Sequence, residues 1–372
     1  MGDTFGAAFR LTTFGESHGV ALGGVIEGCP PGLTLDVDAL QAACDRRRPG
    51  TSKLVSGRAE TDRVTILSGL DRGVTLGTPI AFTVPNVDAD PAAYDALRDV
   101  YRPSHADFTW EARFGRRMVE GGGRASARET VARVVGGDVA RQVLASIDPD
   151  PIDVVAWVDS VGDLRASVDP DHVTQQGVDA SPVRCPDRAA SAAFEARIRE
   201  VRAAGDSVGG VVRVVARGVR AGLGAPVFDK LDADLAKALM SLPACKGVEV
   251  GSGFAGTLLT GRAHNDAFYA DAGTIRTRTN RSGGVQGGIS NGMPLLLAAA
   301  FKPVATIFHE QETVDAAGRP AVVRPRGRHD PCVLPRAVPI VEAMVWLVLA
   351  DHRLRWRAQV GAPPPIPRLA PR

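Results

Sequence analysis

Apolar residues are arranged along this chain in two patterns. Short runs rich in β-branched residues predict strands, and these cover residues 9–14, 64–67, 80–84, 152–158, 210–216 and 248–251. Longer segments, in which apolar positions recur every three to four residues, predict helices over residues 126–145, 189–204, 229–242 and 337–349. Because hairpin-like spacings alternate with helices, we expect an α+β fold of antiparallel sheets covered by helices.

A further helix is expected before residue 48. Asp36 is suited to be its N-cap, and Pro49-Gly50 would end it. Residues 162–190 are polar and turn-rich, which is typical of a surface connection, and no segment resembles a linker between independent domains. We therefore predict one domain over residues 1–360, followed by a proline-rich, disordered tail over residues 361–372.

Charge adds one restriction. The 372 residues carry 44 Lys and Arg against 42 Asp and Glu, so the net charge of +2 gives no overall field that would favour nucleic acid. Five of these cations are lysine and the rest are arginine. Codon usage explains such a bias without function, but planar guanidinium groups also bind carboxylates and phosphates through paired hydrogen bonds.

The five cysteines are odd in number and have no C-x-x-C spacing, which argues against a disulfide scaffold and a structural zinc site. The first residues do not form a secretory signal, and the longest apolar runs are too short to cross a bilayer. We expect a cytoplasmic protein with neither a metal ion nor a membrane partner.

The segment Gly15-Glu16-Ser17-His18-Gly19 matches the G-x-S-x-G pattern of the serine hydrolase elbow. That elbow needs a helix after the serine, whereas the glycine-punctuated residues that follow predict another strand. A serine hydrolase is therefore disfavoured. His18 remains open to two interpretations, a structural histidine or an acid that acts on a bound anion.

Three other segments combine cations with glycine or proline. Gly121-Gly122-Gly123-Arg124 precedes Ser126 and a predicted helix, and such a helix start binds anions through its free amides. Asp45-Arg46-Arg47-Arg48 either complements a helix dipole or captures an anion with Lys53. Lys302 to Thr306 would suit a cofactor phosphate, and Gly327 to Cys332 lacks the companion ligands of a metal site.

Taken together and in order, these motifs are similar to the successive signatures of the chorismate synthase family. The segments that carry the resemblance span residues 9–351 and read GESHG, DRRRPG, RPSHAD, GGGRASARET, SPVRCPD, GDSVGG, FDKLDADLAKALMS, NRSGGVQGGISNG and GRHDPCVLPRAVPIVEAM. Each motif is weak alone, but the complete set is highly specific. The resemblance implies the family's β-α-β sandwich of antiparallel sheets with helices, assembled as a homotetramer.

The resemblance also implies a reaction. Chorismate synthases convert 5-enolpyruvylshikimate 3-phosphate to chorismate by 1,4-anti elimination of phosphate, and they require reduced FMN although the reaction has no net redox change. By this resemblance His18 protonates the leaving phosphate, His105 stabilises or protonates the reduced flavin, and Asp330 works with the flavin's central nitrogen to remove the ring proton. The substrate carries a phosphate and two carboxylates, which suits an arginine-rich pocket.

The remaining site residues are likewise implied by the resemblance. Substrate would be bound by Ser17, Arg47, Arg48, Lys53, Arg102 and Arg128. FMN would be held by Arg124, Ala125, Ser126, Pro243, Ala244, Gly288, Lys302, Pro303, Val304, Ala305, Thr306 and Arg328. Two positions depart from the family pattern: Cys245 stands where an apolar residue is expected, and Lys53 where many members have arginine.

A flavin-dependent oxidoreductase or flavin reductase would also bind FMN, and it is the alternative to the synthase. The chain has no dinucleotide-binding fingerprint, so we expect its flavin to be reduced by an external flavin reductase.

Overall fold

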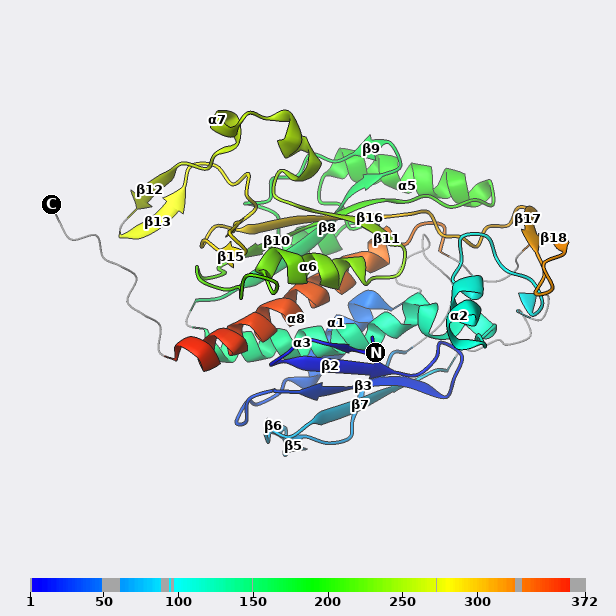
Figure 1. Cartoon of the computed structure of the whole chain (residues 1–372), viewed down its shortest axis with the longest axis horizontal. Helices are drawn as coiled ribbons and strands as arrows, with labels where there is room; N and C mark the ends of the chain where they lie inside the picture. Colours follow the sequence, from blue (N-terminus) through cyan, green and yellow to red (C-terminus); the bar gives the residue numbers. More distant parts are fainter. Residues whose placement is uncertain are drawn as a thin grey trace.

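The computed structural model describes residues 2–48, 61–87, 94, 97–148, 150–271, 273–324 and 330–361. Within these ranges two five-stranded antiparallel sheets enclose a layer of helices (Figure 1). This is the β-α-β sandwich that the family resemblance implied. Of the predicted tail over residues 361–372, residues 362–372 lie outside the described residues.

The first sheet has the strand order β1-β2-β3-β7-β4. Its strands are β1 (Thr4–Phe5), β2 (Arg10–Phe14), β3 (Ala21–Glu27), β7 (Ile80–Pro85) and β4 (Thr65–Ile66). β2 and β3 form a hairpin whose connection contains Ser17 and His18. β7 alternates buried and partly exposed positions, as expected for a sheet with one face on the core.

The second sheet has the order β11-β16-β10-β8-β9. Its strands are β11 (Cys245–Val250), β16 (Leu295–Phe301), β10 (Gly210–Arg217), β8 (Asp153–Val161) and β9 (Leu164–Arg165). Cys245 at the start of β11 pairs with Phe301 at the end of β16. This register places Lys246 and Lys302 at the same edge of the sheet.

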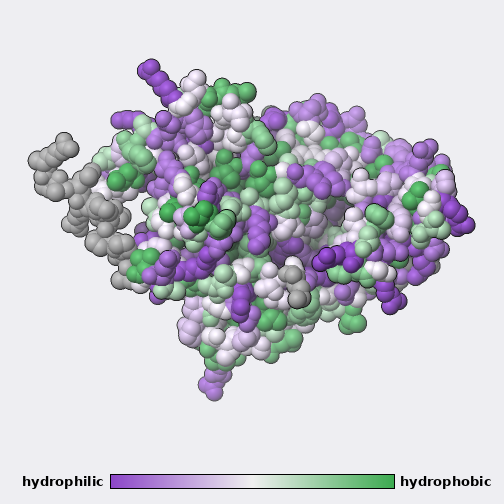
Figure 2. All heavy atoms as spheres, viewed as in Figure 1, coloured by the Kyte–Doolittle hydropathy of each residue, from purple (hydrophilic) through white to green (hydrophobic). Residues whose placement is uncertain are grey.

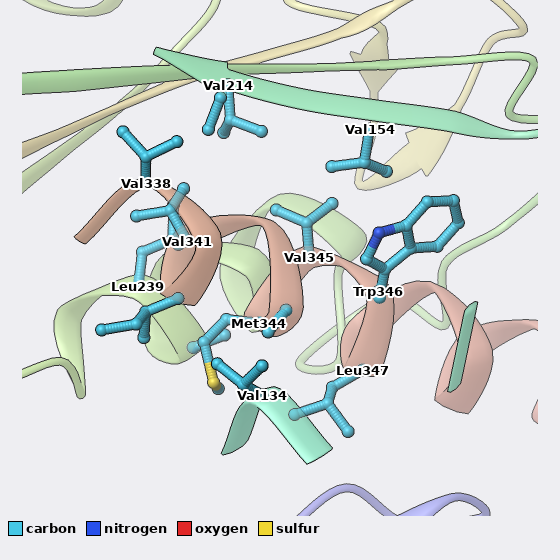
Figure 3. Close-up of a cluster of buried hydrophobic side chains, with 14 of the residues drawn as sticks. Val134, Val154, Val214, Leu239, Val338, Val341, Met344, Val345, Trp346 and Leu347 are labelled. Carbon is cyan, nitrogen blue, oxygen red and sulfur yellow. The ribbon is translucent and has the colours of Figure 1, made fainter. Parts of the chain in front are cut away.

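Four helices fill the space between the sheets in Figure 1, and α5 (Arg188–Ala203) covers the outer face of the second sheet. The inner helices are α1 (Val37–Arg47), α3 (Thr130–Ile147), α6 (Leu231–Met240) and α8 (Leu334–Val360). Figure 3 shows Val345 and Val338 of α8 pointing toward Val154 and Val214 of the second sheet, while Leu347 points toward α3. α8 is therefore the shared centre of the core.

The other elements are short and lie around this sandwich. The helices are α2 (Asp107–Phe114), α4 (Gln175–Asp179), α7 (Gly261–His264) and the 3-10 turns Glu120–Ala125, Ala127–Glu129 and Gly253–Leu258. The hairpins are β5 (Leu70–Asp71) with β6 (Val74–Thr75), β12 (Phe268–Asp271) with β13 (Thr274–Thr277), β14 (Val285–Gln286) with β15 (Ile289–Ser290), and β17 (Gln311–Val314) with β18 (Pro320–Val323). No helix of the described part combines the length and apolar character needed to cross a bilayer.

The predicted helices are present, and the N-cap of α1 is confirmed, since the Asp36 carboxylate accepts a hydrogen bond from the Ala39 amide at 2.8 Å. α8 is much longer than the predicted 337–349. Its second half lacks an apolar repeat and is held by ion pairs, with His352 on Asp234 and Arg353 on Asp148. Such tertiary contacts are not visible in a local pattern.

α3 and α8 approach each other closely at Gly137. A Cβ atom added there would lie 2.5 Å from Ala343 Cβ and 2.6 Å from Ala343 Cα, so the helices would have to separate. We expect Gly137→Ala to lower the free energy of unfolding by about 1–3 kcal/mol, although alanine favours helices over glycine. The measurement is urea unfolding followed by circular dichroism.

Gly261→Ala is the matched control, because a Cβ at Gly261 would meet no atom within 4 Å. It should leave the unfolding midpoint unchanged. An equally small effect of Gly137→Ala would contradict the close contact of α3 with α8.

Candidate active site

A cavity of about 510 Å³ opens where the first turns of α3 and α8 meet the edge formed by β11 and β16. Figure 2 shows this side of the molecule hollowed, with hydrophilic residues around the opening. The predicted site residues that line the cavity are His18, Arg102, His105, Ala125, Ser126, Arg128, Pro243, Ala244, Lys302, Val304, Ala305, Thr306 and Asp330. Segments more than 300 residues apart in sequence therefore meet here.

His18 reaches the cavity from the connection between β2 and β3. Ser17 beside it is fully buried, and its Oγ lies 3.2 Å from His18 Nδ1. The His18 ring also packs edge-on against Tyr94, with 5.2 Å between the ring centres. A strand follows this turn and not a helix, so the structure agrees with the rejection of a hydrolase elbow.

Asn86, just after β7, holds this turn in place. Its amide nitrogen donates to the carbonyls of Glu16 at 3.0 Å and Gly19 at 2.7 Å. Its amide oxygen accepts from Arg128 Nε at 3.0 Å. Asn86 thus links the histidine turn to an arginine of the cavity, and no motif in the sequence pointed to it.

The glycine run passes directly against both histidines. Gly121 and Gly122 have φ of 63° and 78°, a left-handed conformation that favours glycine. A Cβ on Gly121 would lie 2.2 Å from His18 Nδ1, and one on Gly122 would lie 2.9 Å from His105 Cε1. The sequence suggested that this run binds an anion, but in the structure its glycines allow the backbone to approach the two imidazoles.

His105 is held by a buried carboxylate. Its Nδ1 lies 2.8 Å from Asp107 Oδ1 at the start of α2. Arg102 binds the same carboxylate with two side-chain nitrogens at 2.8 and 2.7 Å, and Arg117 adds a contact at 3.3 Å. Burial opposes ionisation of Asp107, but these hydrogen bonds and charges outweigh it and hold the pKa of Asp107 well below its ordinary value.

A second carboxylate, Asp62, lies between two further arginines. Arg47 donates to it at 2.8 Å, and Arg128 forms an ion pair with its other oxygen. Burial raises the pKa of Asp62, but the two guanidinium groups outweigh burial and keep the pKa below its ordinary value. Burial and the charges of Arg336 and Arg128 lower the pKa of Arg47 to about 10, partly offset by Asp62.

The lysine edge of the cavity has a different character. Lys246 and Lys302 both line it, and the Lys302 amide donates to the Ala244 carbonyl at 2.9 Å, which joins the two segments. Burial lowers the pKa of Lys302, and the nearby charge of Lys246 lowers it further. Within the described residues neither ammonium group forms an ion pair with a carboxylate.

The similarity to known proteins agrees with this arrangement. A family model described as chorismate synthase matches residues 9–354. A chorismate synthase from Thermosynechococcus vestitus is 58% identical over 360 residues, which cover 96% of this chain and 99% of the relative. One from Synechocystis is 56% identical with the same coverage. The chain belongs to the chorismate synthase family.

A solved structure agrees as well. The crystal structure of a chorismate synthase superimposes with a TM-score of 0.74 at 28% sequence identity, over 96% of this chain and 94% of the other. The two catalytic histidines and the aspartate that the family resemblance assigns here are the residues that the cavity brings together.

Other residues assigned by that resemblance do not line the cavity. Arg47 is fully buried behind it, and Arg48 is exposed at the end of α1 beside Asp45. Gly288 packs against Lys230 in the β14–β15 turn, and neither Ser17 nor Pro303 lines the cavity. Lys53 and Arg328 lie outside the described residues.

Arg124 faces a second cavity, of about 410 Å³, which shares His105 with the first. Its guanidinium donates to the Thr13 hydroxyl at 2.8 Å and pairs with Asp3 at 2.9 Å. Arg124 therefore fastens the glycine turn to β2.

Lys246, Arg336 and Tyr94 are among the cavity residues that the sequence did not identify as site residues. Arg336 lies within the quoted motif GRHDPCVLPRAVPIVEAM, six residues after Asp330, and donates to Asp330 Oδ2 at 2.6 Å. Lys246 follows the Pro243-Ala244 turn. For Lys246 and Arg336 the one available sequence signal was therefore their proximity to assigned residues. No feature of the sequence pointed to Tyr94.

The free energy of unfolding should depend on pH through the ionisation of Asp107. Because its folded pKa is depressed, Asp107 stabilises the fold above the unfolded pKa of about 4, and this contribution is lost as pH falls through the folded value. We expect Asp107→Asn to be less stable by about 3 kcal/mol at pH 7, and the difference from wild type to shrink below pH 4. Urea unfolding at several pH values measures this.

Asp38→Asn, at an exposed position in the first turn of α1, is the control and should follow the wild-type pH dependence. A constant difference between wild type and Asp107→Asn from pH 7 to the acid range would show that Asp107 does not stabilise the fold as an anion.

Proposed function

We propose that this chain converts 5-enolpyruvylshikimate 3-phosphate to chorismate in the 510 Å³ cavity, with His18, His105 and Asp330 as its catalytic residues. Elimination of phosphate requires an acid for the leaving group, an acceptor for the ring proton and cations for a polyanion. The observation that carries the proposal is that one cavity holds two histidines, a carboxylate and the arginines Arg102 and Arg128.

Substrate binding rests on an excess of positive charge at Asp62. Asp62 faces Arg47 and Arg128, so this group has two guanidinium charges and one carboxylate charge. In the neighbouring group the carboxylates of Asp107 and Glu111 balance Arg102 and Arg117. The carboxylates fix the guanidinium groups in place while positive charge remains for the substrate. The first turns of α3 and α8 also direct their positive dipole ends toward the cavity.

The two histidines have different partners at Nδ1. The Ser17 hydroxyl lies at Nδ1 of His18, and we assign Nε2 of His18 to protonate the departing phosphate oxygen. The Asp107 carboxylate at Nδ1 orients the His105 imidazole, and we assign His105 to stabilise or protonate the reduced flavin. Asp330, a carboxylate on the same cavity, is the proposed acceptor on the path of the ring proton.

The cavity also fits FMN in its chemistry. Met240, Leu242, Phe301, Val333 and Ile340 give it apolar walls that suit a planar ring system. Lys246, Lys302 and Thr306 supply donors for a phosphate at the lysine edge. When bound, reduced FMN supplies transient electron density that helps phosphate to leave, without net oxidation.

We assign the binding of the flavin ring and the FMN phosphate to the segments with Ala125-Ser126, Pro243-Ala244 and Lys302 to Thr306. Arg124 acts in this assignment by holding the glycine turn, and Arg47 by holding Asp62 and Arg128. Ser17 orients His18. Arg48, Lys53, Gly288 and Arg328 remain proposals that rest on the resemblance alone.

We also propose a homotetramer in the cytoplasm that receives reduced flavin from an external reductase. Five unpaired, buried cysteines support a reducing compartment. The large apolar side chains exposed around α7 and the β12–β13 hairpin, including Phe254, Leu258 and Phe268, support association between subunits.

The reaction is tested anaerobically with photoreduced FMN and 5-enolpyruvylshikimate 3-phosphate, by following chorismate absorbance. We expect His18→Ala and His105→Ala each to lower turnover by about 10²–10⁴-fold, because each removes a positioned acid, while FMN still binds. Near-wild-type turnover in both variants would overturn the assigned roles.

The same assay separates the synthase from a flavin oxidoreductase. A synthase forms chorismate without consuming the reduced flavin, whereas an oxidoreductase consumes NAD(P)H in step with product. Repeating the assay with oxidised FMN and NADPH tests the external reductase, since chorismate formed under those conditions would mean that the chain reduces its own flavin.

The phosphate position gives a prediction that does not depend on turnover. We expect Lys246→Gln to weaken the binding of oxidised FMN about tenfold, because a charge-assisted contact to the phosphate is lost. Riboflavin, which lacks the phosphate, should bind both proteins equally. Titration of flavin fluorescence measures both ligands.

Lys237→Gln, on α6 outside the cavity, is the matched control. Equal losses for FMN and riboflavin in Lys246→Gln would show that Lys246 does not face the phosphate.

A further inference from the structure

Arg336 lies in the first turn of α8 and has no role in the function proposed above. Its guanidinium Nη1 donates to Asp330 Oδ2 at 2.6 Å, and both side chains are largely buried, with exposed fractions of 14% and 10%. A short hydrogen bond between opposite charges in a water-poor site is among the strongest polar contacts in a protein.

The contact pattern of Arg336 differs from that of the other arginines in the cavity. Arg102 binds Asp107 with its backbone and two side-chain nitrogens. Arg128 contacts Asp62, Asn86 and the Pro85 carbonyl. Among the described residues Arg336 pairs with Asp330, and its buried Nε has no hydrogen-bond acceptor.

The hydrogen bond to Asp330 is the contact that fixes the Arg336 guanidinium among the described residues. Its buried Nε has no acceptor, so satisfying the other side-chain N–H groups does not account for its position. Arg336 also adds repulsion toward Arg47, a cost that a neutral residue at position 336 would avoid.

The supports of the two residues are unequal. Asp330 lies outside helices and strands, after a segment beyond the described residues. Arg336 is fixed in α8, the helix at the centre of the core, and its amide donates to the Val333 carbonyl at 3.1 Å. The rigid helix can therefore orient the carboxylate through this hydrogen bond.

We propose that Arg336 is a positioning residue for Asp330, whose carboxylate it binds and orients at the wall of the cavity. This inference rests on the proposed function, in which Asp330 accepts the ring proton. It assigns Arg336 a part in turnover and none in substrate affinity.

The test is a double-mutant cycle with Arg336→Gln, Asp330→Asn and the double variant, measured as kcat and KM in the chorismate assay. We expect Arg336→Gln to lower kcat by roughly tenfold to a hundredfold, as is typical when the partner of a functional group is removed, with KM changed less than threefold. In the Asp330→Asn background the same substitution should have no further effect on kcat.

Arg336→Lys keeps a cation and should recover part of kcat, which loss of packing alone would not explain. Arg133→Gln is the control, because Arg133 is a partly buried arginine paired with Glu129 outside the cavity, and its kcat should be unchanged. Circular dichroism and oxidised-FMN titration establish that each variant is folded and binds flavin.

The outcomes separate this inference from the proposed function. Wild-type turnover of Asp330→Asn would overturn the proposed role of Asp330 and, with it, any positioning by Arg336. If Asp330→Asn is strongly impaired but retains measurable turnover, as expected, then equal effects of Arg336→Gln in both backgrounds, or a rise in KM without a fall in kcat, would overturn the positioning role alone.

Discussion

Repulsion between buried arginines is the constraint around which this site is organised. Arg47, Arg128 and Arg336 are close enough that two of them lower the pKa of the third, in a part of the protein where water cannot screen them. Asp62 makes this tolerable by binding Arg47 and Arg128 at the same time. A pocket in which carboxylates neutralised every arginine would bind a polyanion weakly. A pocket of arginines without carboxylates would destabilise the fold in the absence of substrate. One carboxylate shared by two guanidinium groups lies between these limits.

The layered fold supplies the rigid frame that such a site needs. α3 and α8 pack between the two sheets, and both begin at the cavity (Figure 1). Arg336 lies in α8 itself, and Arg128 lies in the 3-10 turn that leads directly into α3, so both are placed more firmly than residues of a long loop would be. The far end of α8 is tied down as well, since the Asp351 carboxylate accepts hydrogen bonds from the amides of Ala7, Ala8 and Phe9.

The sequence predicted the fold and part of the cavity for different reasons. Strands such as β8 and β10 are rich in valine, and α3 carries an apolar face, so local patterns were enough to predict an α+β fold. The layered sandwich and the assigned cavity residues came from the family resemblance. Neither route pointed to Asp62 and Asn86, because their contacts are with residues far away in the chain. Local reasoning also could not show that the glycine run approaches two imidazoles.

The same glycine run explains how two histidines in one cavity can have separate tasks. Gly121 lies against His18 and Gly122 against His105, so the backbone between them sets the spacing of the rings. Each ring then has its own partner at Nδ1, a neutral hydroxyl for His18 and a buried carboxylate for His105. A carboxylate can only accept a hydrogen bond from the ring, whereas a hydroxyl can donate or accept, so the two partners constrain the imidazoles differently. This difference supports the separate roles proposed for His18 and His105.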